Sequence, residues 1–181
     1  MSSKPSGLAG TATGPAATRS KAATAKPSAK ARRSAARLAA VQAIYQMGIT
    51  GIDADAVIGE FVRFRFGEPV EGAAMVVPDA LLFGDIVRGA TDRREDIDGL
   101  IEGALDQPWS LPRLDALLRA TLRAGAWELL GSEATPPQII VSDYVNVAHA
   151  FFSGREPGMV NAVLDRIARR LRPEAVAATT D

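Results

Sequence analysis

The 181-residue chain contains no cysteine and only one histidine, His149. The absence of thiols excludes disulfides, thiolate catalysis, iron–sulfur clusters and cysteine zinc sites, and it suits a reducing cytoplasm. A single imidazole also excludes any site that needs two. No apolar stretch approaches the roughly 18–20 uncharged residues of a membrane span, which argues against an integral membrane protein.

The motifs of covalent and nucleotide chemistry are missing as well. Neither a P-loop nor a dinucleotide-binding glycine pattern occurs, no serine lies in a nucleophile-elbow pattern, and every lysine lies within residues 1–30. The acidic cluster at 92–98 is interrupted by arginines, which is typical of a solvated helix face rather than a metal site. The sequence therefore predicts a protein that is not an enzyme and that needs no cofactor or metal.

The net charge of zero conceals a strong division of charge along the chain. Residues 1–52 carry eight basic side chains and no acid, because the first acidic residue is Asp53. With 21 basic and 21 acidic residues in total, this segment has a formal charge of +8 and the remainder −8. Such asymmetry points to an anionic partner at the N-terminal end, either a nucleic acid or a membrane surface.

The chain divides into a polar tail, a helical domain and a short C-terminal tail. Residues 1–29 are rich in Ala, Ser, Thr, Pro, Gly and Lys and have too few apolar side chains for a core, so we expect a disordered basic tail. An organellar transit peptide is an alternative for this segment. We expect the helical domain to span 30–172 and a flexible tail to cover 173–181.

Helical periodicity runs through nearly all of the expected domain, and no stretch shows the strict alternation of a strand. The expected helices span about 30–48, 53–66, 78–105, 114–130, 137–151 and 158–171, the fourth being one long or two shorter helices. Asp53 is placed to cap the second helix, and Pro173 to stop the last. Six or seven helices with short connections predict an all-α bundle.

The first helix combines an apolar and a basic half on one stripe. The apolar half is formed by Val41, Ile44 and Tyr45. The cations that continue the stripe toward the N-terminus are Lys30, Arg33 and Arg37. A fully packed helix would not place three cations on its inward stripe, so we expect these turns to project past the core. They would then bind backbone phosphates of a nucleic acid, since no bulky apolar side chain near them favours a membrane anchor.

Three stretches follow one another in a specific order. Residues 32–45 read RRSAARLAAVQAIY, residues 118–129 read LRATLRAGAWEL, and residues 139–151 read IIVSDYVNVAHAF, followed by VNAVLD at 160–165. Together they resemble the arginine-rich opening helix, the "LR…E-L" helix and the closing helix pair of the bacterial transcription antitermination factor NusB family. The resemblance covers residues of about 30–172, nearly the whole chain outside its tails.

This resemblance implies a NusB-like fold of two small helical subdomains. Members of the family bind the boxA element of nascent ribosomal RNA leaders together with the ribosomal protein NusE. The complex then acts on RNA polymerase, with other Nus factors, to suppress premature termination. Oligomeric state does not follow from the resemblance, and a homodimer stays open.

The family's functional positions carry over residue by residue. The matches to its RNA-contacting segment are Arg32, Arg33 and Arg37, with Lys30 as a further cation and Gln42 just below. Asn161 matches an asparagine that borders the RNA surface. Tyr45 and Glu128 are matched to the surface that binds the protein partner.

The sequence also departs from the family pattern. Ser34 and Ala35 stand where some members have further arginines, which predicts weaker RNA affinity or a contribution from Lys30 and the tail. Met159 occupies a position that is often aromatic, and Ser142-Asp143 replaces a common Asn-Glu pair.

Two alternatives remain beside the RNA-binding factor. The same helical domain occurs as the N-terminal part of RNA cytosine methyltransferases, although these enzymes need a cofactor-binding domain and a catalytic cysteine. The other alternative is a homologue with the same fold that has become a homodimeric structural protein without RNA affinity.

Overall fold

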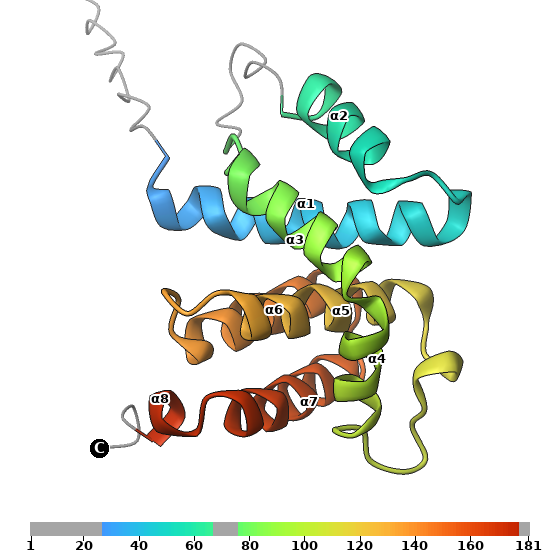
Figure 1. Cartoon of the computed structure of the whole chain (residues 1–181), viewed down its shortest axis with the longest axis vertical. Coiled ribbons are helices and arrows are strands. Elements are labelled where there is room, and N and C mark those ends of the chain that lie inside the picture. The colour runs from blue at the N-terminus through green and yellow to red at the C-terminus, as the bar shows by residue number, and fades with distance from the viewer. Residues whose placement is uncertain (1–26, 67–75, 178–181) are drawn as a thin grey trace, which may run out of the picture.

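The computed structural model describes residues 27–66 and 76–177, and within these ranges it contains helices and no strand (Figure 1). The elements are α1 Ala29–Thr50, α2 Ala54–Phe64, α3 Ala80–Asp92, α4 Arg94–Glu102, the 3₁₀ turn η1 Leu111–Arg113, α5 Ala116–Gly131, α6 Pro137–Phe151, α7 Glu156–Leu171 and α8 Pro173–Ala177. The expected all-α architecture is therefore confirmed.

Local chemistry sets the ends of the first two helices. The Ser28 side chain caps α1, and α1 ends at Gly51, whose φ of 73° lies in the left-handed region that glycine adopts without strain. Asp53 then caps α2 as predicted, because its carboxylate accepts the Ala56 N–H at 2.8 Å. The short turn between α1 and α2 therefore contains the C-terminal cap of the first helix and the N-terminal cap of the second.

The long helix expected over 78–105 is wrong in one respect, since the structure divides it into α3 and α4. Arg93 leaves helical geometry with φ −105° and ψ 26°, and its side chain pairs with Asp96 at 2.7 Å. The apolar stripe continues on both sides of this break, as Ile86, Val87, Ile97 and Ile101 are all buried. An uninterrupted hydrophobic pattern therefore concealed the bend.

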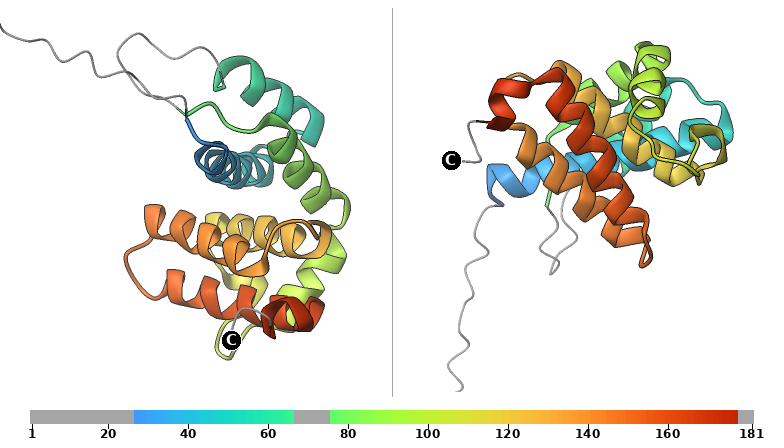
Figure 2. Two further views of the ribbon diagram at one scale, coloured as in Figure 1. Left: turned by 90° about the vertical axis from the view of Figure 1, so that its left-hand side faces the viewer. Right: turned by 90° about the horizontal axis from the view of Figure 1, so that it is seen from below.

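The helices form two groups with α1 at their boundary. Figure 2 shows α1 between α2 and α3 on one side and α5 and α6 on the other, and α1 contacts all four of these helices. The group of α2 and α3 is closed by an aromatic cluster, in which the Phe61 and Phe83 rings stack at 5.4 Å and Phe66 packs edge-on to Phe83 at 4.9 Å. The other group packs α5, α6 and α7 against one another. The two expected subdomains correspond to these groups.

The C-terminal boundary differs from the expectation. Pro173 ends α7 but also begins α8, and Val176 of α8 packs on the core while the carbonyl of Ala175 accepts a hydrogen bond from Gln138. The structure therefore has a helix at residues 173–177, within the segment expected to be a flexible tail, because proline is compatible with a first helical turn. Residues 178–181 of that segment lie outside the described residues. The disordered tail is predicted over residues 1–29. Residues 1–26 lie outside the described residues, whereas Ser28 caps α1 and Ala29 is its first residue.

Candidate nucleic-acid interface

The first turns of α1 present three cations to solvent. Lys30, Arg32 and Arg33 are all exposed. Neither Lys30 nor Arg33 makes a side-chain hydrogen bond or ion pair with the part of the chain that the structure describes. Cations that are not neutralised within the fold are available to an anionic ligand.

The backbone beneath these cations is held in place by several hydrogen bonds. The Ser28 hydroxyl accepts the Ala31 N–H at 3.1 Å and thereby satisfies one of the unpaired donors of the helix start. In the segment before α3, the Val77 carbonyl accepts a hydrogen bond from Arg32 Nε at 3.2 Å, and the Asp79 N–H donates to the Arg32 carbonyl at 3.1 Å. The cations therefore stand on an ordered turn.

Arg37 does not belong to this exposed group, and the expectation that it projects past the core is wrong. Only 2% of its side chain is exposed. Its Nε donates to both carboxylate oxygens of Glu128, its Nη2 also binds Glu128, and its Nη1 donates to Asp143 Oδ2 at 2.6 Å. The third turn of α1 is covered by α5 and α6, so Arg37 meets two carboxylates instead of solvent.

The buried network is completed by Tyr144, whose hydroxyl donates to Glu128 Oε2 at 3.1 Å. Burial lowers the pKa of Arg37, but the hydrogen bond and charge of Glu128 outweigh this effect and raise the pKa above its ordinary value. Burial and then the charge of Glu128 raise the pKa of the Tyr144 hydroxyl. At neutral pH the arginine is therefore charged and the tyrosine neutral.

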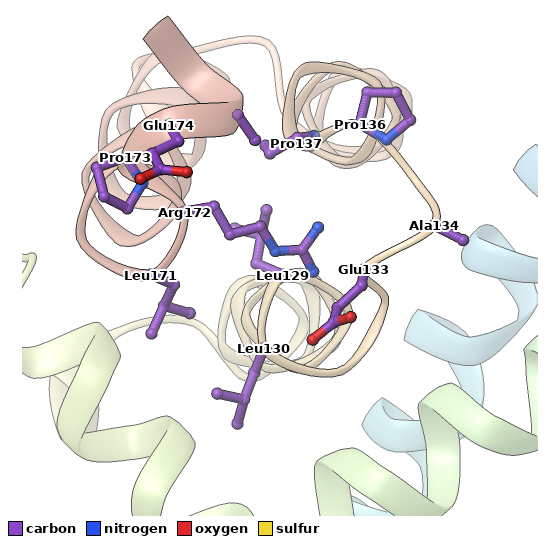
Figure 3. A pocket seen from close by; sticks show the side chains of 11 residues that line it. Leu129, Leu130, Glu133, Ala134, Pro136, Pro137, Leu171, Arg172, Pro173 and Glu174 are labelled. Carbon is purple, nitrogen blue, oxygen red and sulfur yellow. The ribbon is translucent and has the colours of Figure 1, made fainter. Parts of the chain in front are cut away.

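Glu128 is 1% exposed, which corrects the expectation that it contacts a partner protein. Its side chain is occupied by Arg37 and Tyr144, and its backbone carbonyl accepts a hydrogen bond from Arg172 Nη2 at 3.2 Å. Arg172 directly follows α7 and extends toward α5 (Figure 3), where it lines a hollow of about 820 Å³. Since Arg172 also donates to the Thr135 carbonyl, it serves to join α7 to the end of α5.

Gln42 and Tyr45 lie farther along α1, where the helix borders a second hollow. Gln42 is half-buried and Tyr45 is 40% exposed. This hollow of about 440 Å³ lies between the C-terminal half of α1, the start of α5 and the end of α6, and it also has Ile49 and Phe151 on its wall, both exposed. We name it the Tyr45 hollow. It offers exposed apolar side chains of the kind found at protein–protein contacts.

Asn161 is exposed on α7 and lines a third hollow, of about 300 Å³, between α6 and α7. The polar side chains around it include Ser142, Asn146 and Asp165. Ser142 is adjacent in sequence to Asp143, the residue that binds Arg37. The Asn161 hollow is lined by residues of α6, α7 and α8, and none of the residues on its wall belongs to α1.

The described residues include no group of three or more His, Asp or Glu side chains placed to hold a metal ion. None of their helices is long and apolar enough to cross a membrane.

Comparison with known families assigns a class to this all-helical protein with a basic helix start. The NusB family model matches residues 34–169, and the chain therefore belongs to the NusB family. The match includes the buried Arg37 network, the Tyr45 hollow and, apart from Val176, the residues of the Asn161 hollow. The exposed cations of the first two turns, Lys30, Arg32 and Arg33, lie just before it.

Curated relatives have the same assignment. The chain is 51% identical over 143 residues to a "Transcription antitermination protein NusB" of Rhodopseudomonas palustris strain TIE-1, covering 79% of this chain and 82% of the relative. A protein of the same name from Nitrobacter hamburgensis is 50% identical over 141 residues, covering 78% and 88%. These relatives are named as transcription antitermination proteins, so the chain is grouped with antitermination proteins and not with enzymes.

Solved structures agree with the fold. Thermotoga maritima NusB superposes with a TM-score of 0.66 at 26% identity, covering 80% of this chain and 96% of the other. A crystal structure of the antitermination factors NusB and NusE in complex with dsRNA gives a TM-score of 0.63 at 23% identity, covering 76% and 96%.

Proposed function

We propose that this chain is a cytoplasmic RNA-binding antitermination factor that binds boxA-type RNA of nascent ribosomal transcripts together with NusE. The observation that carries the proposal is the group of exposed cations Lys30, Arg32 and Arg33 on a capped helix start, in a segment of 52 residues without an acid. Family membership and the names of the curated relatives support the role in transcription.

These cations bind the RNA mainly through its phosphates. Each phosphate that a Lys or Arg neutralises releases counterions, so affinity falls with salt by a slope of about 0.7 per contact for single-stranded and 0.9 for duplex nucleic acid. The Asn161 hollow, with amide side chains from α6 and α7, supplies hydrogen-bonding groups for base edges in this proposal. Arg37 takes no part in direct contact, since its donors are bound to Glu128 and Asp143.

NusE binds at the Tyr45 hollow in this proposal. The hollow combines the exposed apolar side chains Tyr45, Ile49 and Phe151 with polar groups at its rim, as protein–protein contacts do. The resemblance matches Tyr45 to the partner surface. The complex would act on RNA polymerase indirectly, through NusE and other Nus factors.

The test is a binding titration of the purified full chain with a boxA-type RNA oligonucleotide and with a scrambled RNA, each with and without NusE, over several salt concentrations. We expect tighter binding of the boxA-type RNA and a further gain with NusE. Equal affinity for both RNAs in the presence of NusE would contradict the proposal. The absence of binding to either RNA at low salt would favour the homodimeric structural protein, whose docking surface would then be the same exposed Tyr45 hollow.

Tyr45→Asp separates the two surfaces. A charge at this position disrupts an apolar contact while leaving the first turn of α1 intact, so we expect weaker NusE binding and nearly unchanged affinity for RNA alone. Since Tyr45 is 40% exposed, the variant is expected to fold. Loss of RNA binding without loss of NusE binding would contradict this assignment, because it would mean that the RNA contacts α1 at Tyr45.

A further inference from the structure

Asp143 of α6 holds two consecutive turns of α1. Ser34 Oγ donates to Asp143 Oδ2 at 2.9 Å, and Arg37 Nη1 donates to the same oxygen at 2.6 Å. Ser34 and Arg37 are three residues apart and therefore face the same side of the helix. One carboxylate thus fixes α1 to α6 at two points along the helix.

Arg37 extends this connection to α5. Its guanidinium binds both carboxylate oxygens of Glu128 while it also binds Asp143. Because the guanidinium is planar and rigid, such a fork fixes the direction of the side chain as well as its distance from the acids. Rotation of α1 about its axis, or sliding along α5, would break these bonds inside a site where water cannot replace them.

The orientation of α1 determines where its exposed cations point. Arg33 immediately precedes Ser34 and lies one turn before Arg37, and Lys30 lies one turn before Ser34. A change of helix phase by one residue would redirect both cations by about 100°. The buried network and the exposed cations therefore belong to one helix, and fixing the rotation of this helix about its axis also fixes the direction in which the cations point.

We propose that Ser34 and Arg37 are positioning residues for RNA binding, which lock α1 on Asp143 and Glu128 so that Lys30 and Arg33 face the RNA. This inference rests on the proposed RNA-binding function and adds to it a division of labour within the basic segment. Lys30 and Arg33 contact phosphates, whereas Ser34 and Arg37 act only through the helix.

The decisive measurement separates affinity from the salt slope. A positioning residue changes the free-energy cost of holding α1 in its binding orientation, and therefore the affinity, but the bound complex still neutralises the same number of phosphates, so the slope is unchanged. Ser34→Ala removes one hydrogen bond to a carboxylate without changing any charge. We expect it to weaken binding of a boxA-type RNA about 2-fold to 10-fold while leaving the slope of log K against log salt unchanged. Ser34→Thr keeps the hydroxyl and is expected to restore the affinity.

Arg33→Ala is the matched contact variant, one residue away on the same helix. It should lower the slope by about 0.7–0.9, as expected for the loss of one phosphate contact. Arg37→Lys adds a further distinction, since lysine keeps the positive charge but lacks the planar fork. Positioning predicts that Arg37→Lys binds more weakly with an unchanged slope, whereas a phosphate contact predicts nearly normal affinity.

The outcomes are distinct. Wild-type affinity in both Ser34→Ala and Arg37→Lys, or a reduced slope in Ser34→Ala, would overturn the positioning role while leaving the proposed function intact. Failure of the wild-type chain to bind any RNA would instead overturn the proposed function. Circular dichroism of each variant checks that the helices are retained, and Ser34→Ala provides the test if Arg37→Lys does not fold.

Discussion

The first two turns of α1 and its third turn carry the same kind of side chain in opposite surroundings. In the first two turns, Lys30 and Arg33 are exposed, whereas Arg37 in the third turn is 2% exposed and bound to two acids. These acids lie 91 and 106 residues further along the chain. The comparison teaches that the role of an arginine is set by the acids that tertiary structure brings to it, and not by its place in a basic run.

The energetic consequences of the two surroundings differ as well. An exposed arginine keeps its hydration and adds little to stability. A buried guanidinium has lost its hydration, and so have Glu128 and much of Asp143, so each of these charges depends on the others. The same substitution should therefore have very different effects at the two positions.

The largest expected effect follows from breaking the buried pair. Arg37→Met retains much of the side-chain volume but leaves Glu128 buried without its cation, and we expect the free energy of unfolding to fall by about 3–5 kcal/mol. Arg33→Met is the control on the same helix and should change it by less than about 0.5 kcal/mol. Urea unfolding of both variants measures the difference. Equal losses would show that the two positions have similar environments.

A second substitution tests the exposed turn in the same way. Arg32→Ala combined with Arg33→Ala removes two phosphate contacts, and we expect the slope of log K against log salt to fall by about 1.4–1.8. At physiological salt this corresponds to more than about tenfold weaker RNA binding. The thermal midpoint should stay close to that of the wild type, since both side chains are exposed. An unchanged slope with the protein folded would rule out these cations as the RNA contact.

The sequence predicted the all-α class and most helix positions, because these depend on local periodicity and caps. Asp53 at the start of α2 and the helices expected over 114–130, 137–151 and 158–171 are confirmed. The break at Arg93 and the start of α8 at Pro173 were missed. Both depend on backbone geometry that a continuous hydrophobic pattern does not reveal.

The candidate site was predictable only in part, for a physical reason. Exposure of Lys30, Arg32 and Arg33 agrees with the charge pattern, but helical spacing alone placed Arg37 with them. A signal for the buried pair was present, since Arg37 and Glu128 are each a lone charge within an apolar stretch. Their pairing across 91 residues needed the packing of α1 on α5, which no local pattern supplies.

A third test concerns the pH dependence of the buried network. The raised pKa of Tyr144 means that the unfolded tyrosine ionises near pH 10 while the folded one stays neutral. Ionisation then favours the unfolded state, so this contribution to stability is complete below about pH 10 and is lost as pH rises further. We expect unfolding free energy to fall by up to about 1.4 kcal/mol per pH unit there.

Tyr144→Phe is the control for this prediction, because it removes the titrating group. The variant should lose stability at neutral pH, where Glu128 loses a donor, but its stability should fall less steeply above pH 10. Tyr45 is present in both proteins and is 40% exposed, so its ionisation is largely common to the folded and unfolded states. Parallel pH profiles for the two proteins would contradict the assignment.

The smallest expected effect concerns the cap that orders the first turn. Ser28→Ala removes the acceptor of the Ala31 N–H, a change that costs a helix end about 0.5–2 kcal/mol. No side chain from Ala29 to Arg33 is fully buried, so losing the cap destabilises the first turn locally and lets it fray. We therefore expect the global free energy of unfolding to change by less than about 0.5 kcal/mol. Amide hydrogen exchange should accelerate at Ala31 but not at the buried third turn. Ser28→Asn keeps a capping oxygen and should exchange like the wild type. A global loss as large as that of Arg37→Met would show that the first turn is as tightly coupled to the core as the third, and would remove the distinction between the two.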